Sequence, residues 1–214
     1  MKKMIELKDV VKKFKQDTIL DHVNLELYDN RIYGFVGRNG SGKSILFKLI
    51  SGYMRPDSGT ITVEGKKLGK NCDFPESLGV LIESPGFLWY ESGLSNLRFL
   101  AKIQKNITDE EVKEAIHMVG LDSNSKKHVG KYSLGMKQRL GIAQAVMEQP
   151  NILILDEPMN GLDDAGVDLI RTLLLNYKKE GRVILLASHN KEDIDLLCDE
   201  VYHMNGGNVV KGEK

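Results

Sequence analysis

The sequence predicts an α/β fold in which a largely parallel sheet carries an inserted helical lobe, with an antiparallel sheet at the N-terminus. Three observations indicate this fold. Short, continuous apolar runs are typical of parallel strands that are covered on both faces, and alternating apolar and polar residues are typical of half-buried strands. A helix-rich stretch separates two of the continuous runs. The 214 residues fit a single domain, because one hydrophobic core can grow slightly beyond this size.

The first part of the chain alternates in the manner of half-buried strands. Its apolar positions are Ile5, Leu7, Ile19, Val23, Leu25 and Leu27. The run from Ile32 to Val36 is instead almost continuously apolar and leads into a glycine-rich turn, and apolar residues then recur at helical spacing from Ile45 to Ile50. We therefore expect an antiparallel sheet, followed by a buried strand, a turn and a helix.

The rest of the chain supplies further strands and the lobe. Parallel strands are expected at Gly79 to Ile82, Ile152 to Leu155 and Val183 to Ala187. Helices are expected at Ser95 to Gln104, from Thr108 onward, and at Leu134 to Glu148, with Thr108 and Glu111 forming a capping box. The sequence thus predicts a helical lobe at about 84–150, inserted into a core formed by about 1–83 and 151–214.

Composition excludes several classes of protein. Apolar residues make up 41% and charged residues 28%, which is typical of globular chains, and thirty basic residues balance thirty acidic ones. A nucleic-acid partner is therefore not expected. Cys72 and Cys198 are too few for a disulfide framework. Neither a secretory signal nor an apolar run long enough to span a bilayer is expected, so any work at a membrane would need another anchor.

A phosphate-binding motif follows the first buried strand. It consists of Gly37, Arg38, Asn39, Gly40, Ser41, Gly42, Lys43 and Ser44, which match the P-loop pattern GxxxxGK[ST] in full. The glycines let backbone N–H groups point at phosphate oxygens, while Lys43 neutralises the β- and γ-phosphates and Ser44 binds Mg²⁺. The alternative is an accidental glycine turn, but the motif lies between a predicted strand and a predicted helix, as a P-loop requires.

Two acids end the apolar strand that begins at Ile152. Asp156 and Glu157 are therefore expected at the carboxyl edge of the sheet, beside the phosphate site. Asp156 would hold the metal ion, and Glu157 would act as the general base that polarises the attacking water. The alternative is that both acids only cap the turn before Pro158.

The run Tyr132 to Arg139 resembles the LSGGQ signature of ABC ATPases and the KQR that usually follows it. The P-loop, Asp156-Glu157, the segment Asn160 to Asp163 and Ser188-His189 stand in the order of that family, so the resemblance covers nearly the whole chain. It implies a P-loop NTPase (RecA-like) core with an N-terminal antiparallel β subdomain and an inserted helical subdomain. It also implies an ATPase that uses ATP and Mg²⁺.

The resemblance further implies an ATP-dependent homodimer in which each nucleotide lies between two copies. Ser133 and Gly135 would complete the site of the second subunit, although Ser133 alone could equally be an ordinary N-cap. Asp163 matches the D-loop aspartate and could also be a turn residue. His189 would be the switch histidine that contacts the γ-phosphate. Phe14 stands where the family places an aromatic ring that stacks on adenine, with a core position as the alternative.

Three residues of the signature and the P-loop depart from the family pattern. Leu134 stands where glycine is usual in the signature, and Met136 where glutamine is usual. Ile45 follows Ser44 where threonine is common, which removes one hydroxyl contact to an inner phosphate. We expect lower affinity for nucleotide and unchanged chemistry.

Glu83 occupies the Q-loop position, where most of the family has glutamine, and is expected to reach the metal ion. This replacement and the residues after it resemble the exporters associated with bacitracin and lantibiotic resistance. The apolar loop Phe87 to Tyr90 is either a satellite hydrophobic cluster or a docking site for a helix of a partner.

The leading hypothesis is a transport motor that drives a separate permease, which would place the chain in the cytoplasm on the inner face of the cell membrane. The permease would dock near Phe87 to Tyr90. Two alternatives are a soluble ABC ATPase acting on DNA or ribosomes, and a switch that binds ATP without turnover. The first usually carries coiled-coil arms or basic tails, which are not visible here, and Glu157 with His189 argues against the second.

Overall fold

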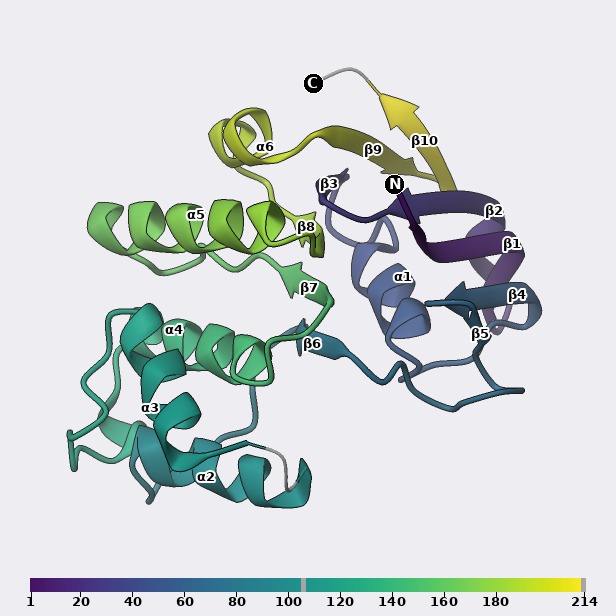
Figure 1. Ribbon diagram of the computed structural model, residues 1–214. Helices are drawn as coiled ribbons and strands as arrows, with labels where there is room; N and C mark the ends of the chain where they lie inside the picture. Colours follow the sequence, from purple (N-terminus) through teal and green to yellow (C-terminus); the bar gives the residue numbers. More distant parts are fainter. Residues whose placement is uncertain (105–106, 213–214) are drawn as a thin grey trace.

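The computed structural model describes residues 1–104 and 107–212, which form two sheets with α-helices packed around them (Figure 1). The first sheet is antiparallel, with strand order β2-β1-β4-β5. Its strands are β1 (Lys3–Phe14), β2 (Asp17–Tyr28), β4 (Ser58–Val63) and β5 (Lys66–Lys67). The alternation predicted for the N-terminal stretch is confirmed by β1 and β2.

The second sheet has the order β10-β9-β3-β8-β7-β6 and is parallel except for β10. Its strands are β3 (Arg31–Val36), β6 (Leu78–Leu81), β7 (Ile152–Asp156), β8 (Val183–Ala187), β9 (Glu200–Asn205) and β10 (Asn208–Gly212). Successive residues of one strand belong to different apolar clusters: Ile152 and Ile154 face one cluster, and Leu153 and Leu155 face the other. Burial on both faces explains the continuous apolar runs.

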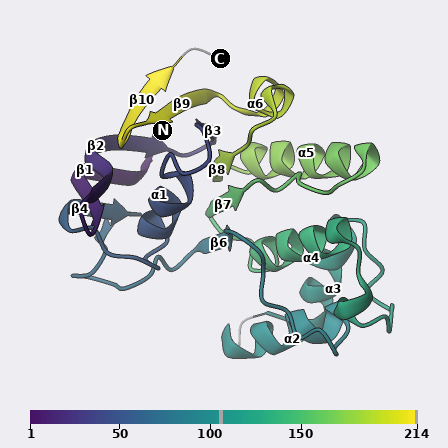
Figure 2. The same ribbon diagram turned by 180° about the vertical axis from the view of Figure 1, so that it is seen from behind.

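Six α-helices surround the sheets within the described residues. They are α1 (Lys43–Ile50), α2 (Gly93–Gln104), α3 (Asp109–Met118), α4 (Leu134–Val146), α5 (Asp164–Lys179) and α6 (Lys191–Leu197), with a 3₁₀ turn at Val129–Lys131. Both ribbon views show α2, α3 and α4 gathered at one end, away from β1 and β2 (Figures 1 and 2). Because this group lies between β6 and β7 in the chain, it is the helical insertion that the sequence predicts.

Local signals account for where several elements begin and end. The capping box of α3 is confirmed, since the Thr108 hydroxyl accepts the N–H of Glu111 and the Glu111 carboxylate accepts the N–H of Thr108. Gly79 in β6 lets α4 pack closely, because a Cβ at this position would lie 1.9 Å from the carbonyl oxygen of Ala145. The predicted ends of β6, α2 and α4 are wrong by one or two residues, where helix and strand ends fray.

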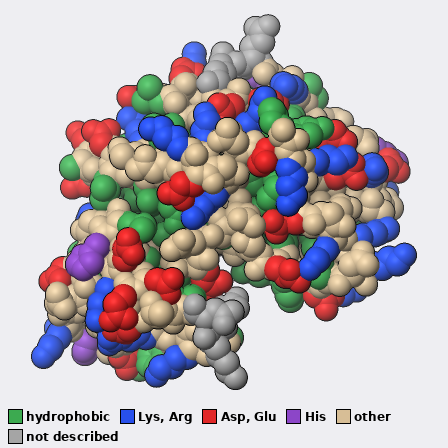
Figure 3. Space-filling model, viewed as in Figure 1, with side chains coloured by type: hydrophobic (Ala, Val, Ile, Leu, Met, Phe, Trp, Pro, Cys, Tyr) green, Lys and Arg blue, Asp and Glu red, His purple; other side chains and the backbone are tan. Residues whose placement is uncertain are grey.

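Acidic and basic side chains alternate over the face shown in Figure 3, which presents no broad patch of one sign. A notch separates the lobe of α2 and α3 from the side that carries the antiparallel sheet. Among residues 1–104 and 107–212, no helix is both long and apolar enough to cross a membrane.

Candidate functional site

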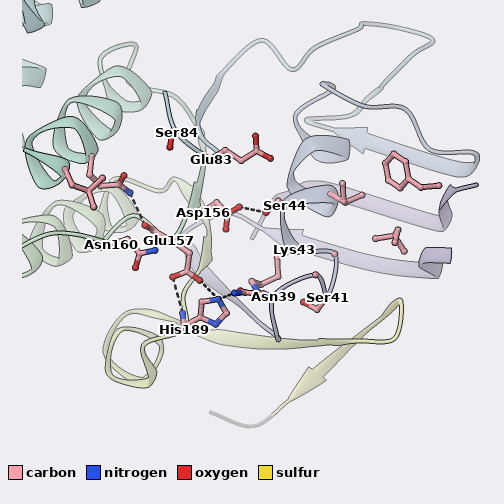
Figure 4. Close-up of a pocket in the computed structure, with 17 residues that line it drawn as sticks. Asn39, Ser41, Lys43, Ser44, Glu83, Ser84, Asp156, Glu157, Asn160 and His189 are labelled. Carbon is pink, nitrogen blue, oxygen red and sulfur yellow. Dashed lines mark hydrogen bonds and ion pairs between the residues drawn. The ribbon is translucent and has the colours of Figure 1, made fainter. Parts of the chain in front are cut away.

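A pocket of about 660 Å³ opens at the carboxyl edge of the parallel sheet (Figure 4). It is lined by the turn between β3 and α1 and by residues that follow β6, β7 and β8. The carboxyl ends of parallel strands meet at one edge, so segments far apart in the sequence converge there. The lining residues used below are Phe14, Asn39, Gly40, Ser41, Gly42, Lys43, Ser44, Ile45, Glu83, Leu134, Gln138, Asp156, Glu157, Asn160 and His189.

The P-loop forms a cradle for an anion. Gly42 is the N-cap of α1 with a left-handed backbone (φ +100°), and no side chain caps this helix. The first N–H groups of a helix have no partner within the helix, so these groups and the positive end of the dipole can receive phosphate oxygens. The buried Ser41 hydroxyl oxygen also has no hydrogen-bond partner among the described residues. The cradle therefore fits the phosphates of a nucleotide.

Lys43 supplies the positive charge of the cradle. Only 6% of this residue is exposed, and its Nζ donates to the carbonyl oxygens of Gly37 at 2.7 Å and of Arg38 at 3.4 Å. These two carbonyls come from the P-loop itself, so the ammonium group stays next to the backbone that would surround the phosphates. Arg38 itself is exposed.

Ser44 and Asp156 meet across the pocket, as the sequence predicts. The Ser44 hydroxyl donates to Oδ2 of Asp156. One hydroxyl and one carboxylate suit Mg²⁺, which is usually held by one or two carboxylates together with substrate phosphates. In the part of the chain that the structure describes, no three His, Cys, Asp or Glu side chains form a metal-binding cluster. A metal ion here would depend on nucleotide for its remaining ligands.

Glu157 and His189 lie next to each other in the pocket. The backbone N–H of His189 donates to Oε2 of Glu157 at 3.2 Å, and Nε2 of His189 lies 3.1 Å from Oε1. The same Nε2 lies 3.0 Å from Oδ1 of Asn39, in the P-loop. Burial raises the pKa of Glu157, and the neighbouring Asp156 carboxylate adds to this, while His189 opposes it. A carboxylate of raised pKa beside a phosphate cradle is suited to take a proton from water.

Phe14 and Ile45 also line this pocket. Phe14 is 43% exposed, so the alternative that it is a core residue is wrong. Nζ of Lys12 lies 5.4 Å from the centre of the ring. Ile45 is only partly buried against the core, and its apolar side chain offers a phosphate no hydrogen bond.

The signature residues and Asp163 act as helix caps within this chain. The Ser133 hydroxyl accepts the N–H of Met136 at 3.2 Å and begins α4, and the Asp163 carboxylate accepts the N–H of Gly166 at 3.0 Å and begins α5. The side chain of Leu134 stands at the start of α4 and is 68% exposed. The N-cap alternative is therefore confirmed for Ser133 within the single chain, while Asp163, given above as a possible turn residue, is the N-cap of α5. The roles of Ser133, Gly135 and Asp163 in a second subunit stay predictions.

Glu83 lies at the edge of the pocket with a left-handed backbone (φ +60°). Its carboxylate accepts a hydrogen bond from Nζ of Lys48 at 2.5 Å, a contact that the sequence analysis missed. Lys48 follows Ser44 by four residues and so shares its face of α1, which is the signal that could have indicated it.

Sequence reasoning also assigned no role to Gln138 and Asn160, which line the pocket. The side-chain amide of Gln138 donates to the main-chain carbonyl of Glu157 at 2.9 Å. Gln138 lies within the signature run Tyr132 to Arg139, and Asn160 begins the segment that ends at Asp163, so the family motifs could have indicated both.

Comparisons with known proteins identify the family of the chain. Residues 20–160 match the family model described as ABC transporter. The uncharacterised ABC transporter ATP-binding protein YybJ of Bacillus subtilis (strain 168) is 44% identical over 99% of this chain and 97% of its own length. The bacitracin transport ATP-binding protein BcrA of Enterococcus faecalis is 38% identical over 99% of this chain and 69% of its own length.

A solved structure of an ATP-binding subunit of an ABC transporter superposes with a TM-score of 0.88 at 25% identity, over 98% of this chain and 89% of its own. The predicted RecA-like P-loop fold and the resemblance to bacitracin transporters are thereby confirmed. The chain belongs to the ABC transporter family and is an ATP-binding, ATP-hydrolysing domain.

Proposed function

We propose that two copies of this chain close on ATP and Mg²⁺ and drive a separate membrane permease that exports a peptide antibiotic or a similar compound. The observation that carries the proposal is the Glu157–His189 pair beside Lys43 in one pocket, because this pair gives the phosphate cradle a means of activating water. A protein that only bound ATP would not need it.

The pocket residues have different roles in the proposed hydrolysis. Lys43 and the N-terminus of α1 bind the β- and γ-phosphates and stabilise the charge that develops on them. Glu157 takes the proton of the attacking water, and burial favours this because it makes the carboxylate a stronger base. His189 holds Glu157 through its backbone N–H and reaches Asn39 in the P-loop with its ring.

The residues that would hold Mg²⁺ are Ser44 and Asp156, whose oxygens already meet, with Glu83 as a further candidate. When bound, Mg²⁺ neutralises charge on the phosphates. Glu83 must leave Lys48 to reach it, because the two side chains are paired in the structure.

The exposed start of α4 supports the proposal that two copies form a dimer around ATP. Leu134, the first residue of α4, is 68% exposed, so this end of the helix lies at the surface. A helix N-terminus attracts phosphate, and a second copy would present its nucleotide there. Ser133 and Gly135 of one copy would then contact the γ-phosphate held by the other, with Asp163 at the same interface.

The apolar loop Phe87 to Tyr90 supports the proposal that a permease docks on this chain. Phe87 packs on the core, while Trp89 is 71% exposed, so the loop is only partly a satellite cluster. The buried Asn96 fixes the backbone of Leu88 through two hydrogen bonds, and the carbonyl oxygen of Trp89 accepts the N–H of Gly130. Apolar side chains on a firmly held loop are suited to a permanent partner. Docking there would keep the chain on the inner face of the cell membrane.

Export is proposed because the bacitracin transport protein aligns with 99% of this chain and because Glu83 stands at the Q-loop position.

The test of the transport proposal is co-purification of the tagged chain from detergent-solubilised membranes of its native cells, compared with Trp89→Ser. We expect a polypeptide with several membrane-spanning segments, and less of it with Trp89→Ser. Recovery of ribosomes or DNA instead would contradict the transport proposal.

A further inference from the structure

Gln138 connects the signature helix to the catalytic loop. Its Nε2 donates to the main-chain carbonyl of Glu157 at 2.9 Å, and the residue is only partly exposed. Gln138 follows Leu134 by four residues, so the two share one face of α4, and both line the nucleotide pocket.

The backbone of Glu157 requires such support. Its φ is +52°, a left-handed conformation that a residue with a Cβ rarely adopts and that surrounding contacts must stabilise. Its N–H donates to Ala187 of β8 at 2.9 Å, which fixes one side of the peptide. Its carbonyl accepts from Gln138 and, at 3.2 Å, from the N–H of Asn160. Of these three contacts, only that of Gln138 comes from the helical lobe.

The start of α4 and the loop after Glu157 are also packed without spare room. A Cβ on Gly135 would lie 2.6 Å from the carbonyl oxygen of Gly161, and a Cβ on Gly161 would lie 2.7 Å from Cδ2 of Leu134. Because of this packing, a movement of α4 would also move the loop. The hydrogen bond from the amide of Gln138 would transmit that movement to the backbone of Glu157.

We propose that Gln138 is a positioning residue for ATP hydrolysis, which fixes the general base Glu157 from the signature helix. This inference rests on the proposed role of Glu157 as the base. Gln138 touches neither substrate nor metal in this role, because it acts through the backbone of Glu157. The proposal predicts that loss of its N–H slows hydrolysis of bound ATP and leaves ATP binding intact.

The experiment compares Gln138→Met, Gln138→Asn and the control Gln144→Met. Methionine keeps the length of the side chain without the N–H, and asparagine keeps the amide but is one methylene shorter. Gln144 stands on the same helix and lines a different hollow, together with Tyr53 and Phe74. ATP affinity at equilibrium and the single-turnover rate of hydrolysis are measured for each protein.

We expect Gln138→Met and Gln138→Asn to bind ATP within about twofold of wild type and to hydrolyse bound ATP about 5- to 30-fold more slowly, as for the loss of one partly buried hydrogen bond. The control should match wild type in both. The ratio of rate to bound nucleotide is measured on the same molecules, so partial misfolding does not mimic the result.

Hydrolysis by Gln138→Met at the wild-type rate would overturn the proposal and would leave the proposed function intact. Slow hydrolysis by Gln138→Asn alone would indicate a packing role and would overturn it as well, as would a parallel loss of affinity and rate. A wild-type protein that does not hydrolyse Mg-ATP would instead contradict the proposed function.

Discussion

The N-termini of α1 and α4 can both bind an anion, but only one of them is ready to do so within a single chain. At α1, Gly42 provides no capping side chain and the charged Lys43 is almost completely buried beside the open N–H groups. At α4, the Ser133 hydroxyl already caps the helix, and Leu134 beside it is 68% exposed. The difference teaches that, within one chain, the N-terminus of α1 is open to phosphate and that of α4 is already capped; contact of α4 with the nucleotide of a second copy is part of the proposal.

The largest expected effect is that of Glu157→Gln, which should separate ATP binding at the N-terminus of α1 from ATP hydrolysis. Glu157→Gln keeps the shape of the side chain but removes the base, so turnover should fall by about 10²- to 10⁴-fold while ATP still binds. Phosphate release and nucleotide binding measure the two steps. The matched control is Glu180→Gln, an exposed residue at the C-terminal end of α5. A Glu157→Gln protein with normal turnover would remove Glu157 from the mechanism.

Lys43→Ala should disable the α1 cradle itself. It deletes the charge-assisted hydrogen bonds to the phosphates, so ATP affinity should fall by about 100-fold. Lys66→Ala is the control, because Lys66 is an exposed lysine of strand β5 that also has an ionic partner, Glu76. Equilibrium binding of a fluorescent ATP analogue measures both. Unchanged affinity in Lys43→Ala would show that the buried lysine does not serve the cradle.

Phe14→Ala should weaken the same cradle at its outer edge. An aromatic contact contributes about 0.5–1.5 kcal/mol, which corresponds to about a 2- to 12-fold loss of ATP affinity. Phe14→Trp should keep the affinity, since it keeps an aromatic face. Equal affinities in all three proteins would mean that the base does not stack on this ring.

The smallest effect concerns Glu83 and Lys48. We expect Glu83→Gln to retain hydrolysis, to bind metal-free ATP more tightly and to need more Mg²⁺ for half-maximal activity, because it removes a negative charge near the phosphates. The shift should be about two- to fivefold, since Lys48 already neutralises this exposed carboxylate.

Lys48→Gln should shift the Mg²⁺ requirement the opposite way, because it frees Glu83 for the metal ion. In a Glu83→Gln background the same change should have no effect on that requirement. Titrations of ATP binding with Mg²⁺ and with EDTA test both statements. Superimposed curves would show that Glu83 senses neither metal nor phosphate.

The sequence predicted the elements whose signals are local. The P-loop, the capping box at Thr108 and the buried run Val183 to Ala187 each depend on neighbours within a few residues, and all three are confirmed. The antiparallel sheet followed from the alternation in β1 and β2, whereas β4 and β5 were missed.

Other features depend on contacts between distant segments and were not predicted. Strand β9 joins the sheet through its pairing with β3, far earlier in the chain, and neither β9 nor α5 was expected. The Lys48–Glu83 pair and the contact of Gln138 with Glu157 likewise exist only after folding. Ser133 fits both a cap and a phosphate ligand, so its residue type alone could not decide between them.

The most direct test of the two-copy account is the mass of Glu157→Gln in solution, measured by light scattering. The chain has a mass of 24.0 kDa, and we expect this value without nucleotide and twice this value with saturating Mg-ATP. Adding Ser133→Arg should restore the single-chain mass with ATP still bound, because the larger side chain crowds the γ-phosphate of the facing copy. A Glu157→Gln protein that binds Mg-ATP and stays at 24.0 kDa would contradict the account.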